Sequence, residues 1–297
     1  MKIVVAGASG VVGQALMPLL VQEGHDVVGF TRNPNSATEL KKKGIEPVIL
    51  DVFDREAVFS ALQETKPDAV IHQLTSLSAR NFSDNARIRK EGTRNLVDAS
   101  LAADVGKMVV QSISWTYAPG DGPAEEDSPL DLDAPPPRST TIEGVCALES
   151  AASEMPEHVI LRYGLLYGNG TWYAPDGYLA EQARQRLLPA TRGISSFVHV
   201  DDAALAAANA LNWPSGCYNI VDDEPAAGTD WLPVFADAVG APQPDVQQGH
   251  AAWERGALNG KALRHGWKPR YTSWRDGFRL ALGSASSQDS LRQDARP

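Results

Sequence analysis

The sequence predicts an α/β protein built on a doubly wound parallel sheet, and three observations lead to this fold class. Short runs of β-branched and apolar residues alternate with longer helical patterns over the first 110 residues. These strand-like runs are apolar throughout, which is typical of parallel strands that are buried on both faces. Parallel strands need crossover connections, and right-handed crossovers through helices cover both faces of the sheet.

The expected strands are each four residues long, and they cover residues 3–6, 27–30, 47–50, 69–72, 108–111 and 158–161. The expected helices show apolar positions at helical spacing, and they cover residues 14–23, 36–43, 56–65, 88–102, 141–152, 203–211 and 231–239. Residues 118–138 are rich in proline and acidic residues, and they predict a long loop of the kind that often carries function. Beyond residue 283 the chain is polar without an apolar period, which predicts a mobile tail over residues 284–297.

The composition excludes several classes of protein. The 297 residues include 37 acidic and 27 basic ones, so the formal net charge is −10, whereas a general nucleic-acid binder needs clustered lysine and arginine. No apolar run reaches the roughly 20 residues of a membrane-spanning helix, and the first residues do not resemble a signal peptide. The two cysteines and six histidines lack disulfide-framework or metal-ligand spacing. We therefore expect a cytoplasmic protein with no metal, nucleic-acid partner or membrane partner.

A glycine-rich turn joins the first expected strand to the first expected helix. Gly7 permits a tight turn, Gly10 lets the backbone approach a pyrophosphate, and Gly13 lets the helix pack closely on the strand. The amides at the start of the helix then bind the anion. The turn predicts a dinucleotide site that includes Gly7, Ser9, Gly10, Val11, Val12 and Gly13.

The end of the second strand distinguishes NAD from NADP. An acidic residue at this place would bind the ribose 2′-hydroxyl, but the chain has Thr31 and Arg32 here, and arginine suits a 2′-phosphate. NADP is therefore the predicted cofactor, with NAD as the weaker alternative. Asp51 and Val52 follow the third strand, where the Asp51 carboxylate can accept a hydrogen bond from the adenine amino group or simply stabilise a turn.

Motifs in a fixed order along the chain are similar to those of one large family. They are the G-x-x-G-x-x-G turn, VIHQLT at 70–75, EGTRNL at 91–96, RYG at 162–164, FVHVDD at 197–202, YNI at 218–220 and GWKP at 266–269. The chain resembles the extended and atypical branch of the short-chain dehydrogenase/reductase superfamily, the NAD(P)-dependent epimerase/dehydratase-like group. The resemblance implies a Rossmann domain over residues 1–165 with a return segment at about 196–219. It also implies a smaller C-terminal substrate-binding cap formed by residues 166–195 and 220–283. It further implies that the cofactor contacts Leu74, Thr75, Ser112 and Tyr163.

The acid–base pair of this family is missing from the chain. Family members carry a Tyr-x-x-x-Lys pattern, in which the lysine lowers the pKa of the tyrosine and binds ribose, often with a glutamate four residues after the lysine. Glu149 fits the glutamate, but Val145 then stands at the lysine position and Thr141 at the tyrosine position. None of the seven tyrosines has a lysine four residues later. A tyrosine with its usual pKa near 10 needs a nearby cation to work near neutral pH.

Substitute proton donors or polarising groups are expected near the end of the fifth strand. The family places a serine or threonine here, but strict spacing from Tyr117 falls on Ile113. Ser112 and Ser114 lie on one face of the strand, and Ser114 is nearer the carboxyl end, where ligands bind in such sheets. Ser114, Thr141 and Tyr117 are the predicted catalytic residues, although Tyr117 can equally be a packed aromatic residue.

Seven aromatic residues follow the predicted nucleotide domain or lie at its edge: Trp115, Tyr117, Tyr163, Tyr167, Trp172, Tyr173 and Tyr178. Such a group favours a flat or apolar small-molecule substrate, with ordinary domain packing as the alternative.

The leading hypothesis is an NADP(H)-dependent oxidoreductase that transfers a hydride to a small hydrophobic or aromatic carbonyl or enone. The alternatives are a non-catalytic NADP-binding regulator or sensor, and a redox-neutral isomerase, cyclase or lyase. The sequence is compatible with a homodimer.

Overall fold

The computed structural model of the chain describes residues 1–76 and 82–282, so the tail predicted at 284–297 lies outside the described residues. The chain forms two compact units. The first unit comprises residues 1–118, 129–162 and 204–218, and the second comprises residues 119–128, 163–203 and 219 onward. Relative to the expected division, residues 119–128 and 196–203 group with the second unit. The expected boundary near residue 165 differs from the observed one by only a few residues.

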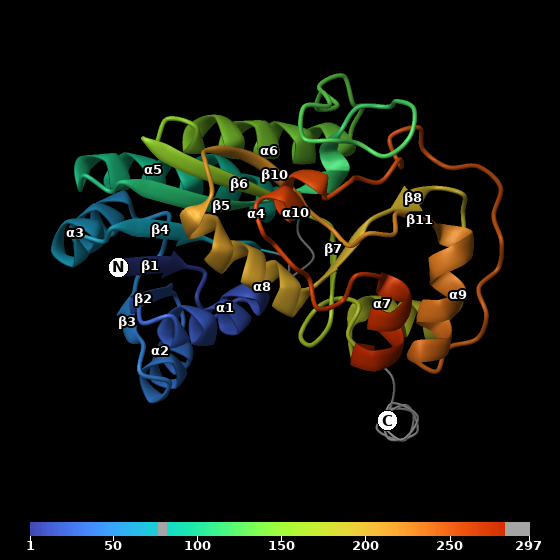
Figure 1. Ribbon diagram of the computed structural model, residues 1–297, viewed down its shortest axis with the longest axis horizontal. Coiled ribbons are helices and arrows are strands. Elements are labelled where there is room, and N and C mark those ends of the chain that lie inside the picture. Colours follow the sequence, from blue (N-terminus) through green and yellow to red (C-terminus); the bar gives the residue numbers. More distant parts are fainter. Residues whose placement is uncertain (77–81, 283–297) are drawn as a thin grey trace. The chain divides into compact units, whose positions relative to one another are not determined.

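A seven-stranded sheet forms the centre of the first unit, in the order β10-β6-β5-β4-β1-β2-β3 (Figure 1). Its strands are β1 Lys2–Ala6, β2 Asp26–Thr31, β3 Glu46–Ile49, β4 Ala69–His72, β5 Lys107–Ile113, β6 Glu157–Tyr163 and β10 Gly216–Ile220. The pairs β3–β2, β2–β1, β1–β4 and β4–β5 are parallel, and Val4 of β1 lies between Val28 of β2 and Val70 of β4. The chain reverses its direction of travel across the sheet between β1 and β4, which confirms the doubly wound α/β fold.

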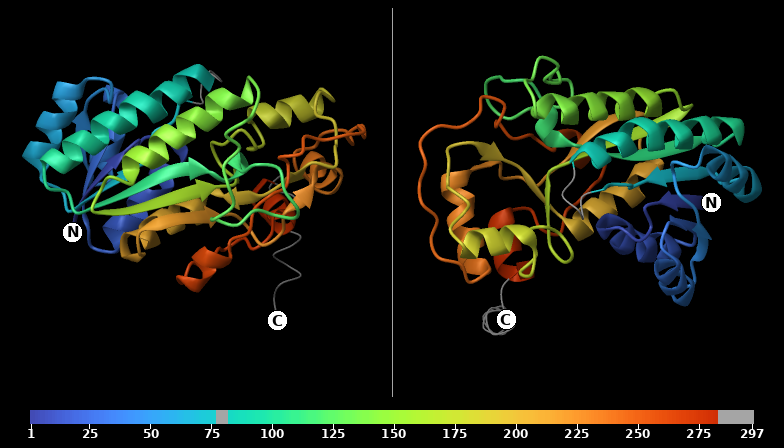
Figure 2. Two further views of the ribbon diagram at one scale, coloured as in Figure 1. Left: turned by 90° about the horizontal axis from the view of Figure 1, so that it is seen from above. Right: turned by 180° about the vertical axis from the view of Figure 1, so that it is seen from behind.

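Helices cover both faces of this sheet (Figures 1 and 2). One face carries α3 (Arg55–Thr65), α5 (Thr93–Ala102) and α6 (Arg138–Ala152), and the other carries α1 (Val11–Gln22) and α2 (Pro34–Lys42). Below α3, α5 and α6 lies a continuous apolar core that includes residues such as Val70, Leu96, Val110 and Leu148, all 1% exposed or less. Because the strands are apolar on both sides, the sheet is the buried middle layer.

The helix predicted over residues 88–102 begins earlier and is not uniform. It consists of α4 (Phe82–Arg87), a π-helical segment η1 (Ile88–Gly92) and α5. The wide turn of η1 buries the side chains of Ile88 and Arg89 against the body of the first unit. A π-helical turn inside an α-helix is rare and is often found at functional sites.

The second unit contains short strands and helices around an aromatic core. β7 (Leu165–Tyr167) pairs in parallel with β9 (Phe197–His199), and β8 (Ile194–Ser195) pairs antiparallel with β11 (Ala226–Ala227). The remaining elements of the described chain are the 3-10 turns η2 Ser114–Thr116 and η3 Ala210–Asn212, the helices α7 Tyr178–Arg184, α8 Val200–Asn209, α9 Gly228–Ala238, α10 Gly260–Arg264 and α11 Trp274–Gly277, and the π-helical η4 Phe278–Leu282.

Two of the seven aromatic residues proposed to face a substrate lie in this core instead. Tyr167 and Tyr173 are 0% and 7% exposed and pack edge-on against Phe197 at centroid distances of 6.5 and 5.5 Å. Packing within the second unit therefore accounts for both rings. Trp172 and Tyr178 form a separate edge-on pair at 6.0 Å, and Tyr178 is 37% exposed.

Candidate functional site

The glycine turn between β1 and α1 is too tight for any other residue. Gly7 has φ +91°, and a Cβ atom on it would lie 2.7 Å from the backbone carbonyl of Gln73 at the end of β4. A Cβ atom on Gly13 would lie 2.3 Å from the carbonyl oxygen of Gly7. Gly10 donates its amide to that same oxygen at 2.9 Å and directly precedes α1, which has no side-chain cap. The 12-residue helix α1 thus begins with uncapped amides beside bare backbone, an arrangement that fits the diphosphate of a dinucleotide.

Gln73 is a residue of this site that the sequence did not single out. Its side chain is 4% exposed, and neither its amide nitrogen nor its amide oxygen has a hydrogen-bond partner in the described part of the chain. Buried amides are nearly always hydrogen-bonded, so a polar ligand beside the glycine turn would satisfy this one. Two signals were available, namely its position directly after a strand that ends next to the turn and its place within the VIHQLT motif at 70–75.

The predicted nucleotide-binding residues at the ends of β2 and β3 lie in contact with one another. The hydroxyls of Ser9 and Thr31 are 3.1 Å apart, which connects the glycine turn to β2. Arg32 is 61% exposed on its side chain, and its nearest carboxylate is Asp51 at 3.9 Å. Asp51 also accepts a hydrogen bond from the amide of Phe53 at 3.0 Å, which is the turn role considered for it. An exposed pair at this distance is weak, so the Arg32 guanidinium can turn to an anionic ligand.

Four polar residues form a buried cluster, which we call the Glu149 cluster: Ser112 of β5, Tyr117 directly after η2, Glu149 of α6 and Arg162 of β6. Ser112 Oγ donates to Glu149 Oε1 at 2.7 Å, and Arg162 donates to both oxygens of Glu149 at 2.9 and 2.7 Å. Arg162 Nη1 also donates to the Tyr117 hydroxyl at 2.9 Å. Burial lowers the pKa of Arg162, but the hydrogen bond and charge of Glu149 outweigh it and leave that pKa raised. The cluster therefore contains a fixed ion pair.

Ser112 and Tyr117, two residues with predicted roles, both have hydrogen-bond partners inside the Glu149 cluster. The hydroxyl of Ser112, expected to contact the cofactor, is used by Glu149. Tyr117 is 1% exposed, and its ring lies 5.0 Å from the Arg162 guanidinium. Arg162 is thus a cation beside Tyr117, although its charge is already shared with a carboxylate.

Ser114 and Thr141 are the two predicted catalytic hydroxyls that lie outside the Glu149 cluster. Ser114 begins η2 at the carboxyl end of β5 and is 4% exposed, and Thr141 is half-buried in the first turn of α6. Within residues 1–76 and 82–282, neither hydroxyl is hydrogen-bonded to another residue, so both can donate to a ligand. One turn further along α6, Val145 is 0% exposed and contributes no polar group.

Tyr163, Leu74 and Thr75 complete the predicted set. The Tyr163 hydroxyl donates to the Ala203 carbonyl at 3.4 Å within the second unit. Leu74 and Thr75 follow β4 and are partly buried, and the Leu74 amide donates to His72 Nδ1 at 3.1 Å. Val52 is buried, and its carbonyl accepts from the Asn95 side chain at 2.9 Å.

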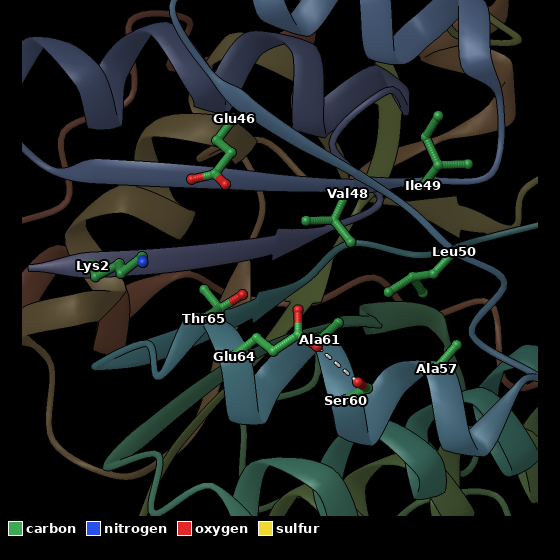
Figure 3. A pocket seen from close by; sticks show the side chains of 10 residues that line it. All are labelled: Lys2, Glu46, Val48, Ile49, Leu50, Ala57, Ser60, Ala61, Glu64 and Thr65. Atoms are coloured by element: carbon green, nitrogen blue, oxygen red, sulfur yellow. Dashed lines mark hydrogen bonds between the residues drawn. The ribbon is translucent and has the colours of Figure 1, made fainter.

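One hollow of the described first unit lies away from the predicted site residues. It has a volume of about 280 Å³ and runs between the edge strand β3 and α3 (Figure 3). Ser60 donates to Glu64 at its rim, and none of the predicted site residues lines it. The described part of the chain contains no cluster of three or more histidine, cysteine, aspartate or glutamate residues placed to hold a metal ion. Among the described helices, none has the length and apolarity to cross a bilayer.

Comparison with known proteins decides the family. Residues 3–220 match the NAD dependent epimerase/dehydratase family. The chain belongs to this family. The resemblance inferred from the motif order is therefore confirmed, and with it a family that depends on nicotinamide dinucleotides.

Three proteins illustrate how the chain is related to other members. A Streptomyces 3-diazoavenalumate denitrifying reductase is 40% identical over 94% of this chain and 99% of its own length. A Stenotrophomonas maltophilia 2-alkyl-3-oxoalkanoate reductase is 32% identical over 82% of this chain and 78% of its own length. The crystal structure of Thermus thermophilus UDP-glucose 4-epimerase in complex with NAD is 27% identical, with a TM-score of 0.75, and covers 95% of this chain and 98% of the other.

Proposed function

We propose that this protein is an NADP(H)-dependent oxidoreductase that transfers a hydride to a small aromatic or apolar acceptor. Three lines of reasoning support the proposal. The glycine turn and Gln73 fit a dinucleotide, two relatives with high coverage are named as reductases, and Arg32 takes the place of an acidic residue at the end of β2. The bound cofactor supplies the hydride from C4 of its nicotinamide ring.

The residues of the first unit have distinct roles in this proposal. The amides at the start of α1 bind the diphosphate, and the Arg32 fork binds the 2′-phosphate. Ser114 and Thr141 face the acceptor in this proposal, because their hydroxyls have no other partner in the described chain. Toward a carbonyl oxygen the hydroxyls donate hydrogen bonds, and toward a diazonium ion their oxygen lone pairs face the positive charge. Serine and threonine hydroxyls are poor acids, so in neither case do they release a proton.

We infer the substrate class from Thr141 and Val145, which stand at the positions of the family's tyrosine and lysine. Reduction of a carbonyl consumes a hydride and a proton, whereas an arenediazonium ion takes a hydride and releases dinitrogen without needing a proton. The atoms balance as Ar–N₂⁺ + H⁻ → Ar–H + N₂, with the hydride provided by NADPH, which becomes NADP⁺. A site without an acid suits the second reaction, and the 40% identical relative is named as a denitrifying reductase of a diazo compound. We therefore propose a diazo-substituted aromatic acceptor as the first choice, with the carbonyl or enone as the second.

The experiment follows NADPH oxidation by purified protein against a panel of arenediazonium salts, ketones, quinones and enones. For each molecule of NADPH consumed, we expect one molecule of dinitrogen and one molecule of the arene in which hydrogen has replaced the diazonium group. A reaction without protein and one with the Gly13→Ala variant correct for direct reduction by NADPH. Turnover of ketones or enones alone would reject the diazo substrate but keep the oxidoreductase. Product formed without net NADPH consumption would show a redox-neutral enzyme, and tight NADPH binding without any turnover would show a regulator.

The choice of NADP over NAD rests on Arg32 and has its own test. Replacing Arg32 with Ala removes the guanidinium fork, so the Kd for NADPH should rise by about 10- to 100-fold while the Kd for NADH stays within about twofold. Arg55→Ala, which alters another exposed arginine of the first unit, is the control. If the ratio of the Kd for NADPH to the Kd for NADH is the same in Arg32→Ala as in the wild type, other residues determine the nucleotide preference.

A further inference from the structure

Arg89 is a buried cation that the proposed roles leave unexplained. It lies in the π-helical segment η1 and is only 7% exposed. Within residues 1–76 and 82–282, no carboxylate lies within ion-pair distance of its guanidinium and no hydrogen bond from it is found. Isolated buried charges are costly, and natural proteins retain them mainly where a ligand or a reaction uses them.

The position of Arg89 is set by its contact with α6. A Cβ atom built on Gly144 would lie 3.4 Å from Arg89 Cδ and 3.3 Å from the backbone of Ala86. Gly144 immediately precedes Val145, so the arginine stem runs along the same stretch of α6 that carries the substituted lysine position. The absence of a side chain at Gly144 leaves room for that stem.

The charged and titratable groups around Arg89 do not neutralise it. On β4, His72 is fully buried with its Nε2 atom 2.9 Å from the Thr93 hydroxyl, and burial followed by the charge of Arg89 lowers its pKa to about 4. On α6, Glu149 is near enough to raise the pKa of Arg89, but its two oxygens are bonded to Arg162 and Ser112. Burial lowers the pKa of Arg89 to about 10, so it stays charged at neutral pH. The nearby carboxylate is therefore already paired with Arg162, and Arg89 keeps a positive charge that no carboxylate of the described chain pairs with.

We infer that Arg89 replaces the missing family lysine and binds the hydroxyls of the ribose next to the nicotinamide. This inference rests on the proposed dinucleotide site. In the family pattern the lysine of Tyr-x-x-x-Lys binds this ribose, and Val145 cannot. A guanidinium reaching the same stretch of α6 from η1 has a planar set of donors that suits two neighbouring hydroxyls. Three features then act together to put Arg89 in the place of the lysine: the wide π-helical turn, the lack of a side chain at Gly144 and the apolar Val145.

The test compares two ligands that differ in this ribose. NADP⁺ contains it, whereas adenosine 2′,5′-bisphosphate contains only the adenosine half with the 2′-phosphate. Calorimetry on Arg89→Gln should show the Kd for NADP⁺ raised by about 10- to 100-fold, the size expected for lost charged hydrogen bonds, with the Kd for the bisphosphate within about twofold. Arg87→Gln, which alters an exposed arginine two residues earlier, should change neither.

A rescue variant separates the inferred role from a structural one. Adding Val145→Lys to Arg89→Gln restores the lysine of the family and should return NADP⁺ affinity to within about threefold of the wild-type value. Equal weakening of both ligands, with no rescue, would assign Arg89 to folding and overturn the inference. Unchanged NADP⁺ affinity, or a loss confined to substrate affinity, would also overturn it. If Arg89→Gln does not fold, Arg89→Lys must show the same NADP⁺-selective loss. Wild-type protein that binds neither ligand would instead refute the proposed dinucleotide site.

Discussion

Removal of the Glu149 carboxylate should destabilise the protein more than most single substitutions. Glu149 is 8% exposed and accepts three hydrogen bonds of 2.7–2.9 Å, two from the Arg162 guanidinium and one from Ser112. Arg162 is 5% exposed, so Glu149→Ala leaves a buried cation without its carboxylate. Breaking such a pair costs about 3–5 kcal/mol, because the remaining charge keeps its desolvation penalty. At about 2–4 °C per kcal/mol, the midpoint of thermal unfolding should fall by roughly 6–20 °C.

The same reasoning predicts that removing both charges is milder. Glu149→Leu with Arg162→Met replaces the pair by apolar side chains, and buried pairs replaced in this way are often neutral in stability. The assay is a double-mutant cycle by thermal and urea unfolding, with Ser150→Ala, an exposed neighbour on α6, as the control. The reasoning is refuted if Glu149→Ala costs less than about 1 kcal/mol, or if the double variant is as unstable as the sum of its single variants.

Three further predictions follow from the same unit. Gly13→Ala places a Cβ atom 2.3 Å from the Gly7 carbonyl oxygen, so the Kd for NADP⁺ by calorimetry should rise at least about tenfold. Gly106→Ala, whose Cβ atom would meet only the Asp68 carbonyl oxygen at 3.7 Å, should bind as wild type. Burial keeps His72 neutral with a pKa of about 4 against about 6.5 in the unfolded chain. Above pH 6.5 the imidazole is neutral in both states, and as the pH falls toward 4 the unfolded chain takes up a proton that the folded chain does not. The free energy of unfolding therefore falls by up to about 3 kcal/mol in that window, and in urea unfolding the stability of His72→Gln should depend less on pH there than that of the wild type. Ser114→Ala should lower kcat/KM by about tenfold or more on the accepted substrate at unchanged NADPH affinity, and equal kcat/KM would remove Ser114 from the site.

Much of the first unit could be predicted from sequence because its signals are local. The glycine turn, the apolar strands and the helix patterns each depend on residues close together in the chain, and all of them appear at nearly the predicted positions. Differences occur where local signals compete with packing. The helix predicted over 88–102 extends back through a π-helical turn that the sequence period does not show, and Tyr167 and Tyr173 pack in a core formed by residues as distant as Phe278.

The sequence by itself determined the fold class, the family and the absence of any Tyr-x-x-x-Lys spacing in the chain, since each is a matter of residue identity and spacing. Only the tertiary structure decided which polar groups already have partners. It pairs Glu149 with Arg162 from another element, it leaves the buried Gln73 amide without a hydrogen-bond partner, and it leaves Arg89 without an ion pair in the described chain. Hydrogen-bond partners in this site come from strands and helices far apart in sequence. Packing therefore decides which polar groups of the site remain available to a ligand, and spacing along the chain does not encode that packing.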